Sequence, residues 1–241
     1  MRRFFLDNKT IRDNRIIIDG QEAHHIKDVI RLKVGDRFLG LDGAGKVYTL
    51  RIRSLTDKVE AEIEKVSSKC IDVPKVLLAC ALPKKSKIDY IVEKATELGV
   101  SEIVPMITER TIVKVDKKSR ASKQRRWDKI AVEASKQCGR DTLPKIYEPM
   151  NFKDALNIAG ELGYARKIMP CLCEGTRSLD KALSGSKKDV AIFIGPEGDF
   201  TRQETGLARD NNCDPVSLGP LVLKVDTACI FTVSVVMGRF S

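Results

Sequence analysis

The feature that most constrains the fold is an uninterrupted apolar run from Val76 to Leu82. A strand with one solvent-exposed face alternates apolar and polar residues, so a continuous run predicts a strand that is covered on both faces. Further short apolar runs follow along the chain at Ile103–Ile107, Ile168–Leu172, Val190–Ile194 and Val216–Leu218. Buried strands that recur between helical segments predict an α/β domain with a parallel sheet flanked by helices.

Amphipathic segments fill most of the intervals between these runs. Pro83 suits the first position of a helix, where a missing N–H is no loss, and Gly99 suits the position just after its end. Thr201 to Glu204 reads Thr-Arg-Gln-Glu, the pattern of a capping box at a helix start. The predicted helices cover residues 83–98, Ser119–Cys138, Thr201–Asn211 and Val225–Arg239.

Residues 1–70 follow a different pattern, in which short strands predominate. One helix is expected over Gln21–Leu32, with Ile26, Val29 and Ile30 on its buried face. Strands are expected at Ile16–Ile18, Arg37–Leu41, Lys46–Arg53 and Lys58–Val66. This pattern predicts a small β-barrel. The boundary near Pro74 divides the chain into domains at residues 1–70 and 73–241.

The formal net charge is +10, and an excess of positive charge favours polyanionic partners. The segment from Lys114 to Lys129 holds eight basic and two acidic residues, and thus +6 of that total. Nucleic acid is the expected partner, through its phosphates, because aromatic residues are too few for stacking on many bases. A membrane surface is the weaker alternative, since no amphipathic helix combines a basic face with bulky aromatics.

Several classes of protein are disfavoured because their patterns are absent. No apolar run is long enough to span a bilayer, and the apolar start of the chain ends at Asp7, too early for a signal peptide. We therefore expect a cytoplasmic protein. The seven cysteines are scattered, and Cys171 and Cys173 lack the second pair of a zinc site. We expect reduced thiols packed as small apolar residues in a strand, and no metal.

Three segments follow apolar runs and supply loops at the C-terminal ends of strands, where open α/β sheets bind ligands. They are Cys171–Gly175, Ile194–Phe200 and Leu218–Ala228. In the second, Gly195 and Gly198 permit close approach of the backbone to a ligand and a positive φ. An ordinary tight turn explains the same glycines, so this loop alone does not identify a site.

Nucleotide-binding motifs of other kinds are missing. No G-x-G-x-x-G segment joins a strand to a helix, and Gly43-Ala44-Gly45 lies in the β-rich part, where it predicts a hairpin turn. The lysine-rich segment at residues 83–87 lacks the glycines that cradle phosphates in a P-loop. A nucleotide-hydrolysing enzyme is therefore disfavoured.

Taken together, the motifs resemble the bacterial 16S rRNA (uridine-N3)-methyltransferases of the SPOUT superfamily, over essentially the whole chain. The matching segments are His25-Ile26, Val29–Arg31, Gly35-Asp36, Lys84–Gly99, Glu109-Arg110, Trp127–Arg140, Gly195–Gly198, Leu218–Pro220, Leu223 and Thr227-Ala228. Each segment alone is weak evidence for the family, but all of them in this order along one chain are specific for it.

The resemblance implies a PUA-like N-terminal β-barrel that helps to bind RNA. It also implies a C-terminal SPOUT domain whose last strands and helix form a trefoil knot, and a homodimer with the site near its interface. The expected reaction is methylation of N3 of one uridine, U1498, in the 16S rRNA of the small ribosomal subunit. S-adenosylmethionine is the expected donor, and no metal is needed because the donor itself carries the reactive methyl group.

The resemblance places the methyl donor against the three loops. The residues expected to hold it are Leu172, Cys173, Glu174, Gly195, Pro196, Glu197, Gly198, Leu218, Gly219, Pro220, Leu223, Thr227 and Ala228. Glu197 either accepts a hydrogen bond from a hydroxyl group, caps the next helix or only shapes its loop. Thr227 either bonds to the donor or caps the last helix.

The third loop departs from the family pattern where charge matters. The family usually reads Leu-Arg-Thr-Glu-Thr-Ala, whereas residues 223–228 read Leu-Lys-Val-Asp-Thr-Ala. Both charges remain, but lysine does not replace arginine in bidentate contacts. The resemblance makes Lys224 the candidate that stabilises the uridine anion and Asp226 the candidate that accepts the N3 proton.

Candidates for RNA binding come from the basic segment and from matching motifs. They are Arg2, Arg3, His25, Arg31, Arg110, Lys123, Arg125, Arg126 and Arg140. Packing against the barrel also explains His25, and a solvated helix face also explains the basic segment. Arg110 and Arg140 fit a structural role as well as an RNA contact.

Two other functions fit the same residues. One is 2′-O-methylation of ribose, another SPOUT reaction, which mapping the methylated atom would separate from N3 methylation. The other is a ribosome-binding protein with a decayed donor site, which the altered third loop suggests. Calorimetry with S-adenosylmethionine would decide that alternative.

Overall fold

The computed structural model describes residues 1–6, 11–12, 14–68, 74–84, 87–185 and 189–239. The chain divides into two compact units. The first comprises Met1–Asp72 and Ser135–Leu143, and the second comprises Val73–Ala134 and Pro144–Ser241. Residues 135–143, which we expected in the α/β domain, thus group with the β-rich unit.

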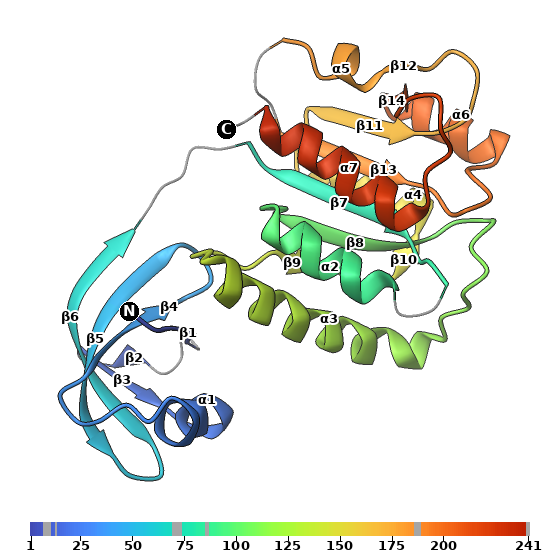
Figure 1. Ribbon diagram of the computed structural model, residues 1–241. Helices are drawn as coiled ribbons and strands as arrows, with labels where there is room; N and C mark the ends of the chain where they lie inside the picture. The colour runs from blue at the N-terminus through green and yellow to red at the C-terminus, as the bar shows by residue number, and fades with distance from the viewer. Residues whose placement is uncertain (7–10, 13, 69–73, 85–86, 186–188, 240–241) are drawn as a thin grey trace. The chain divides into compact units, whose positions relative to one another are not determined.

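The first unit is built on a six-stranded sheet with the order β1-β4-β5-β6-β3-β2 (Figure 1). Its strands are β1 (Arg3–Phe5), β2 (Ile11–Arg12), β3 (Arg15–Ile18), β4 (Arg37–Leu41), β5 (Lys46–Leu55) and β6 (Val59–Ser68). The sheet curls around a core that contains Phe4, Phe38 and Leu50. The strands expected from alternation are confirmed, whereas β1 and β2 were not anticipated.

The helix expected over Gln21–Leu32 is only partly right. The α-helix α1 (Gly20–His24) continues as the π-helix η2 (His25–Val29), and the helical segment ends there. Ile26 is buried as expected, but Val29 is 60% exposed. The π-helix changes the angular spacing of successive side chains, so the face predicted from α-helical spacing does not continue.

The second unit contains an eight-stranded sheet with the order β10-β8-β7-β13-β11-β14-β12, and β9 also pairs with β8. All its strand pairs are parallel. The strands are β7 (Val76–Ala81), β8 (Glu102–Ile107), β9 (Lys145–Ile146), β10 (Met150–Asn151), β11 (Arg166–Pro170), β12 (Arg177–Ser178), β13 (Val190–Ile194) and β14 (Cys213–Ser217).

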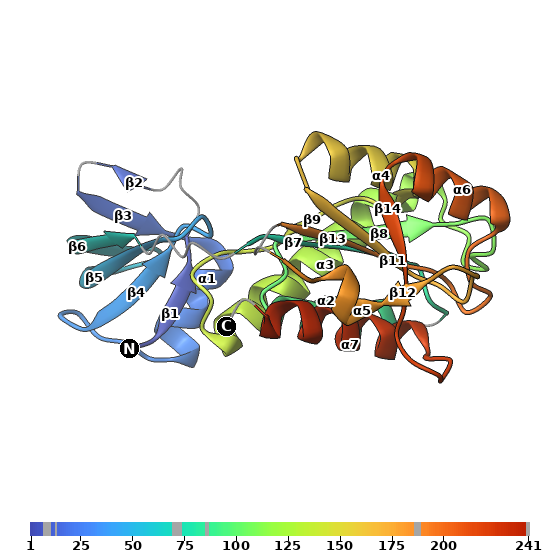
Figure 2. The ribbon, with the colours of Figure 1, turned by 90° about the horizontal axis from the view of Figure 1, so that it is seen from above.

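Helices cover both faces of this sheet, as Figure 2 shows. They are α2 (Lys87–Glu97), α3 (Lys117–Cys138), α4 (Phe152–Glu161), α5 (Leu179–Ala182), α6 (Arg202–Asp210) and α7 (Val225–Gly238). On β7, Val76 and Leu78 pack in a cluster with residues of α2, α3, α5 and α7, whereas Leu77 and Ala79 pack with α4 and α6. The continuous apolar run is explained, because neighbouring side chains point into two different cores, and the α/β fold is confirmed.

Several element boundaries differ from expectation, among them that of β14, which spans Cys213–Ser217 and not Val216–Leu218. The helix expected to open at Pro83 begins at Lys87, so Pro83 belongs to the connection after β7 rather than to the first helical turn. The strand expected to reach Leu172 ends at Pro170, which leaves Cys171 and Leu172 in a loop. A proline that ends a strand fits its missing N–H, which cannot donate to a neighbouring strand.

The connections in the C-terminal part pass over neighbouring strands of the sheet. Strand β11 lies between β13 and β14, so strands that follow one another in the chain are not neighbours in the sheet. A knotted topology requires such crossings. None of the helices within the described ranges combines the length and apolarity needed to cross a membrane.

Candidate functional site

A pocket lies where the chain leaves β11, β13 and β14, at one edge of the second sheet. The space between its lining residues is open to solvent and measures about 600 Å³. The three loops singled out in the sequence all contribute to it, together with the first turn of α7. Parallel strands bring these loops together because their carboxyl ends meet at the same edge.

Most of the residues expected to hold a cofactor line this pocket. They are Leu172, Gly195, Pro196, Glu197, Leu218, Gly219, Leu223 and Ala228. Gly198, Pro220 and Thr227 adjoin lining residues without lining the pocket themselves. Cys173 and Glu174 line a neighbouring groove instead.

Other lining residues were not singled out from the sequence. They are Pro170, Cys171, Ile194, Asp199, Ser217, Leu221, Val222 and Val225. All but Pro170 and Ser217 lie within the three predicted loops, and these two residues directly precede the first and the third loop. Leu221 and Val222 are 74% and 73% exposed, which is unusual for large apolar side chains.

The glycines of the second loop act differently from expectation. Neither Gly195 nor Gly198 has a positive φ; the left-handed residue of this loop is Asp199, with a φ of 60°. A Cβ atom on Gly195 would lie 2.9 Å from the ring of Phe200. Gly195 is therefore needed for close packing against Phe200 within the protein.

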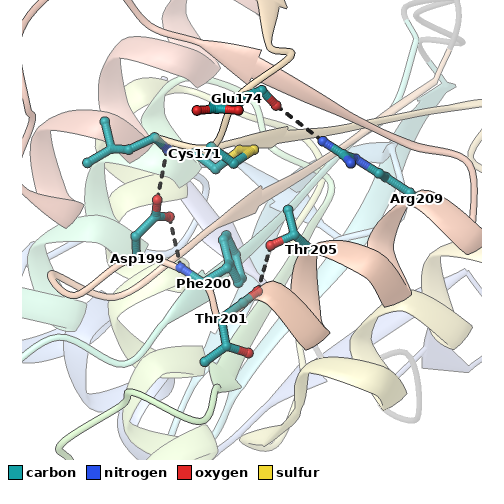
Figure 3. The surroundings of a disulfide bond; sticks show 9 residues. Cys171, Glu174, Asp199, Phe200, Thr201, Thr205 and Arg209 are labelled. Carbon is teal, nitrogen blue, oxygen red and sulfur yellow. Dashed lines mark hydrogen bonds between the residues drawn. A yellow bond between two sulfur atoms is a disulfide. The ribbon is translucent and has the colours of Figure 1, made fainter.

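Asp199 links two of the pocket loops. Its Oδ2 atom accepts a hydrogen bond of 2.8 Å from the backbone N–H of Leu172, and its Oδ1 atom accepts one of 2.8 Å from that of Phe200 (Figure 3). The Leu172 N–H, a backbone group that we expected to face a cofactor, is thus used within the protein. The carboxylate of Asp199 fixes the first loop against the second.

The expectation for Cys171 and Cys173 is wrong. They lie in a loop, both are partly exposed, and their sulfur atoms form a disulfide (Figure 3). The other described cysteines fit better: Cys80, Cys213 and Cys229 are buried, and only Cys138 is exposed. Burial raises the pKa values of Cys213 and Cys229, so these thiols stay protonated. As neutral groups they can pack in the same way as small apolar side chains. Cys70 lies outside the described residues.

The turn after β8 supports the second loop from another side. The Nη1 atom of Arg110 donates a hydrogen bond of 2.6 Å to the carbonyl oxygen of Gly198. The backbone N–H of Glu109 donates to Oε1 of Glu204, 2.9 Å away. Arg110, expected to contact RNA, therefore has a structural partner next to the pocket.

The predicted capping box is confirmed at the start of α6. The side chain of Thr201 accepts from the N–H of Glu204, and the Glu204 carboxylate accepts from the N–H of Thr201. Glu197 is thus not the cap of this helix. Thr227 does not cap α7 either, because the N-cap residue there is Lys224, whose side chain makes no capping bond.

Asp226 is already paired. Its Oδ1 atom lies 3.0 Å from Nζ of Lys87, at the start of α2. Burial alone would raise the pKa of Asp226, but hydrogen bonds from Lys87 and from the backbone, with the positive charges of Lys87 and Lys224, lower it overall. Asp226 is therefore ionised at neutral pH. Lys87 was not recognised from the sequence, because its partner lies far along the chain.

Three of the arginines expected to bind RNA contact residues of their own unit. Arg3 pairs with Asp141 and also approaches the carbonyl oxygen of Arg140. Arg126 pairs with Asp89, which also accepts from the indole N–H of Trp127. Arg140 is partly buried, which lowers its pKa, and it contacts Thr142.

The remaining RNA candidates differ in exposure. Arg2, Arg31 and Arg125 are exposed, and Lys123 is half-buried. Arg31 adopts a φ of 59°, uncommon for a residue with a side chain. The ring of His25 packs edge-on against Phe4, in line with a packing role.

Family comparisons agree with the architecture of both units. Residues 71–237 match the model of an RNA methyltransferase domain, and residues 18–66 match that of an RNA methyltransferase PUA domain. The ribosomal RNA small subunit methyltransferase E of Bacillus subtilis is 30% identical over 230 residues, which cover 91% of this chain and 88% of that protein. The Aquifex aeolicus protein of the same name is 30% identical, and the match covers 94% of this chain and 96% of that protein.

Solved structures extend the likeness to the whole fold. A methyltransferase from Legionella pneumophila, in complex with its cofactor S-adenosylmethionine, is 28% identical with a TM-score of 0.85 and covers 98% of this chain and 97% of its own. The ribosomal RNA small subunit methyltransferase E from Neisseria gonorrhoeae, bound to S-adenosylmethionine, is 25% identical and has a TM-score of 0.85. The match covers 100% of this chain and 98% of that one. The resemblance found in the motifs is confirmed: this chain is an enzyme of the RNA methyltransferase family that includes ribosomal RNA small subunit methyltransferase E.

Proposed function

We propose that this protein transfers the methyl group of S-adenosylmethionine to N3 of one uridine in 16S rRNA, U1498 by the family's convention. The observation that carries the proposal is the pocket in which the three loops after β11, β13 and β14 meet. The relatives named ribosomal RNA small subunit methyltransferase E, and the neighbours solved with S-adenosylmethionine, support it.

The pocket suits a nucleoside-containing donor. Its apolar side chains, among them Leu172, Leu218 and Leu223, offer contact surfaces for an adenine ring. The backbone at Gly219 can be approached closely, because it has no side chain and its surroundings are open. When bound, the donor supplies a methyl group on a sulfonium, and the residues around it keep donor and acceptor aligned.

The acceptor nitrogen needs help that this chain must provide. Uridine N3 carries a weakly acidic proton, and the negative charge left by its removal spreads over O2 and O4. Lys224 is exposed at the N-terminus of α7, where the helix dipole adds a favourable field for an anion. We assign stabilisation of the uridine anion to Lys224.

Asp226 is the proposed acceptor of the N3 proton, acting after its pair with Lys87 opens. In the closed pair its lowered pKa makes it a weak base. Val225, adjacent to Asp226, lines the pocket, so this carboxylate lies next to a lining residue. In this proposal, bound RNA opens the pair with Lys87, and Asp226 becomes a stronger base.

We further propose that the protein acts as a homodimer whose interface covers the pocket loops. Leu221 and Val222 are among the most exposed large apolar residues of the described chain, and Leu172 is 68% exposed. Exposed apolar side chains grouped around one pocket are typical of surfaces that another protein covers. Sedimentation should then report a dimer, and Leu221→Asp should shift it to monomer. The cytoplasm is the proposed location, since the proposed substrate is ribosomal.

The deciding experiment analyses nucleosides from small-subunit rRNA of cells with and without this protein by mass spectrometry. The expected result is 3-methyluridine that disappears with the protein. A missing 2′-O-methylated nucleoside would identify ribose methylation instead. Calorimetry with S-adenosylhomocysteine is the companion measurement, and absence of binding would favour a ribosome-binding protein with a decayed donor site.

A further inference from the structure

A second groove adjoins the donor pocket and takes no part in the roles assigned so far. It holds about 1140 Å³ of empty space and lies between α6 and the loop after β11. It shares Leu172 of the first loop and Asp199 of the second loop with the donor pocket, so the two cavities adjoin where these loops meet. A molecule lying in the groove would be next to the donor.

Two arginines of α6 face this groove. Arg202 and Arg209 both line it and both are exposed. They are seven residues apart, which is about two helical turns and about 10 Å along the axis, so they lie on the same side of the helix. The two guanidinium groups therefore form one row along the groove.

The hydrogen-bonding capacity of this row is largely unused. Arg209 donates through Nη2 to the carbonyl oxygen of Glu174, 3.2 Å away, which aims its guanidinium at the loop (Figure 3). Within the described part of the chain, Arg202 has no hydrogen-bond or ion-pair partner. By contrast, Arg177, an exposed arginine on β12, is paired with Asp214 at 2.9 Å. Arg202 remains available to an external anion.

The acidic residues of the groove oppose the binding of an anion only in part. Both carboxylate oxygens of Asp199 accept backbone hydrogen bonds, so they are turned towards the protein. Glu174 contributes an acidic side chain as well as its carbonyl oxygen, so the lining carries two carboxylates, those of Asp199 and Glu174, beside the two guanidinium groups. Arg202 stands in the first turn of α6, where a cation opposes the helix dipole and an anion would relieve that repulsion.

We infer that this groove binds the phosphate backbone of the RNA strand on one side of the target nucleotide, through Arg202 and Arg209. The inference rests on the proposed function, because it supplies a path for the strand whose base enters the donor site. Guanidinium groups suit phosphates through bidentate hydrogen bonds. Two groups about 10 Å apart reach different phosphates of one strand.

The test compares salt dependence of RNA binding in the full chain. Fluorescein-labelled poly(U) is titrated with wild type, with Arg202→Gln/Arg209→Gln and with the matched control Arg177→Gln, over a series of NaCl concentrations. Loss of two phosphate contacts should weaken binding about tenfold at low salt and reduce the slope of log K against log[salt] by about 1.4. The Arg177→Gln protein should keep the wild-type slope, because its guanidinium is already paired.

Two results would overturn the inference: a double variant with the wild-type slope, or an equal loss in Arg177→Gln. Calorimetry with S-adenosylhomocysteine accompanies each variant and should give the same affinity in all three proteins. If poly(U) binding is unchanged while donor binding and 3-methyluridine formation persist, the groove is rejected and the proposed function stands. If no protein binds S-adenosylhomocysteine, the proposed function itself fails.

Discussion

The Nζ atom of Lys87 and the Oδ1 atom of Asp226 lie 3.0 Å apart and join the start of α2 to the first turn of α7. The charged groups that act on Asp226 are Lys87 from α2 and Lys224 from its own segment, and they hold its pKa below the ordinary value against the opposing effect of burial. The carboxylate of Asp226, the proposed proton acceptor, is thus ionised and held in place.

Replacing Lys87 by methionine should raise the pKa of Asp226 and remove a pH-dependent part of the stability. A carboxylate with a lowered pKa stabilises the fold above its unfolded-state pKa, and that contribution is lost as the pH falls through its folded-state pKa. The difference in unfolding free energy between wild type and Lys87→Met should therefore be largest at neutral pH and shrink in acid. Urea unfolding across pH measures it. Lys87→Arg, which keeps the pair, is the control, and a difference independent of pH would contradict the prediction.

Lys224→Ala should abolish methyl transfer and leave donor affinity nearly intact. The lysine side chain is exposed and makes no hydrogen bond within the described residues, so its loss removes a positive charge beside the uridine and beside Asp226. Turnover with small-subunit rRNA measures methyl transfer, and calorimetry with S-adenosylhomocysteine measures donor affinity. Lys153→Ala, an exposed lysine on α4, should leave both unchanged. Lost donor binding or unchanged turnover would reject the assignment.

Arg110→Ala should weaken the binding of S-adenosylhomocysteine. The variant loses the bond to the Gly198 carbonyl that supports the second loop. A single hydrogen bond contributes about 1 kcal/mol, equivalent to about fivefold in affinity. Glu109→Ala is the matched control, because Glu109 uses only its backbone N–H there. If Arg110→Ala weakens RNA binding alone, the arginine contacts RNA, as its motif suggested.

Glu204→Ala should lower the melting temperature by a few degrees. The variant loses one half of the capping box and the bond to the N–H of Glu109, and loss of a helix cap typically costs about 1 kcal/mol. That cost corresponds to about 2–4 °C for a chain of this size. Thermal unfolding by circular dichroism measures it, with the exposed neighbour Gln203→Ala as control. Equal melting temperatures of the two variants would argue against the double role of Glu204.

Cys171 and Cys173 should resist alkylation until the protein is reduced. The disulfide joins them, whereas Cys138 is exposed and free. Mass spectrometry after labelling with iodoacetamide should therefore find Cys138 modified first and the pair modified only after dithiothreitol. Since Cys171 lines the donor pocket, Cys173→Ser should change the affinity for S-adenosylhomocysteine to the same extent as the reductant. Labelling of the pair without reduction would contradict the disulfide.

The sequence alone determined the features that depend on residues close together in the chain. The capping box at Thr201 and Glu204 satisfies two backbone N–H groups within one turn, so its local pattern suffices to place α6. The continuous apolar run of β7 likewise reports burial on both faces. The same local signals would have located α4, whose Asn151 cap and apolar stripe at Phe152, Ala155 and Leu156 went unused.

Only the tertiary structure decided how the site is held together. Lys87 and Asp226, Arg110 and Gly198, and Leu172 and Asp199 meet because parallel strands bring distant loops to one edge of the sheet. No spacing in the sequence encodes these pairs, since each depends on strand order and on the direction in which a loop leaves its strand. The positive φ of Asp199 and the π-helix after His24 escape local patterns for the same reason: packing, rather than intrinsic preference, sets them.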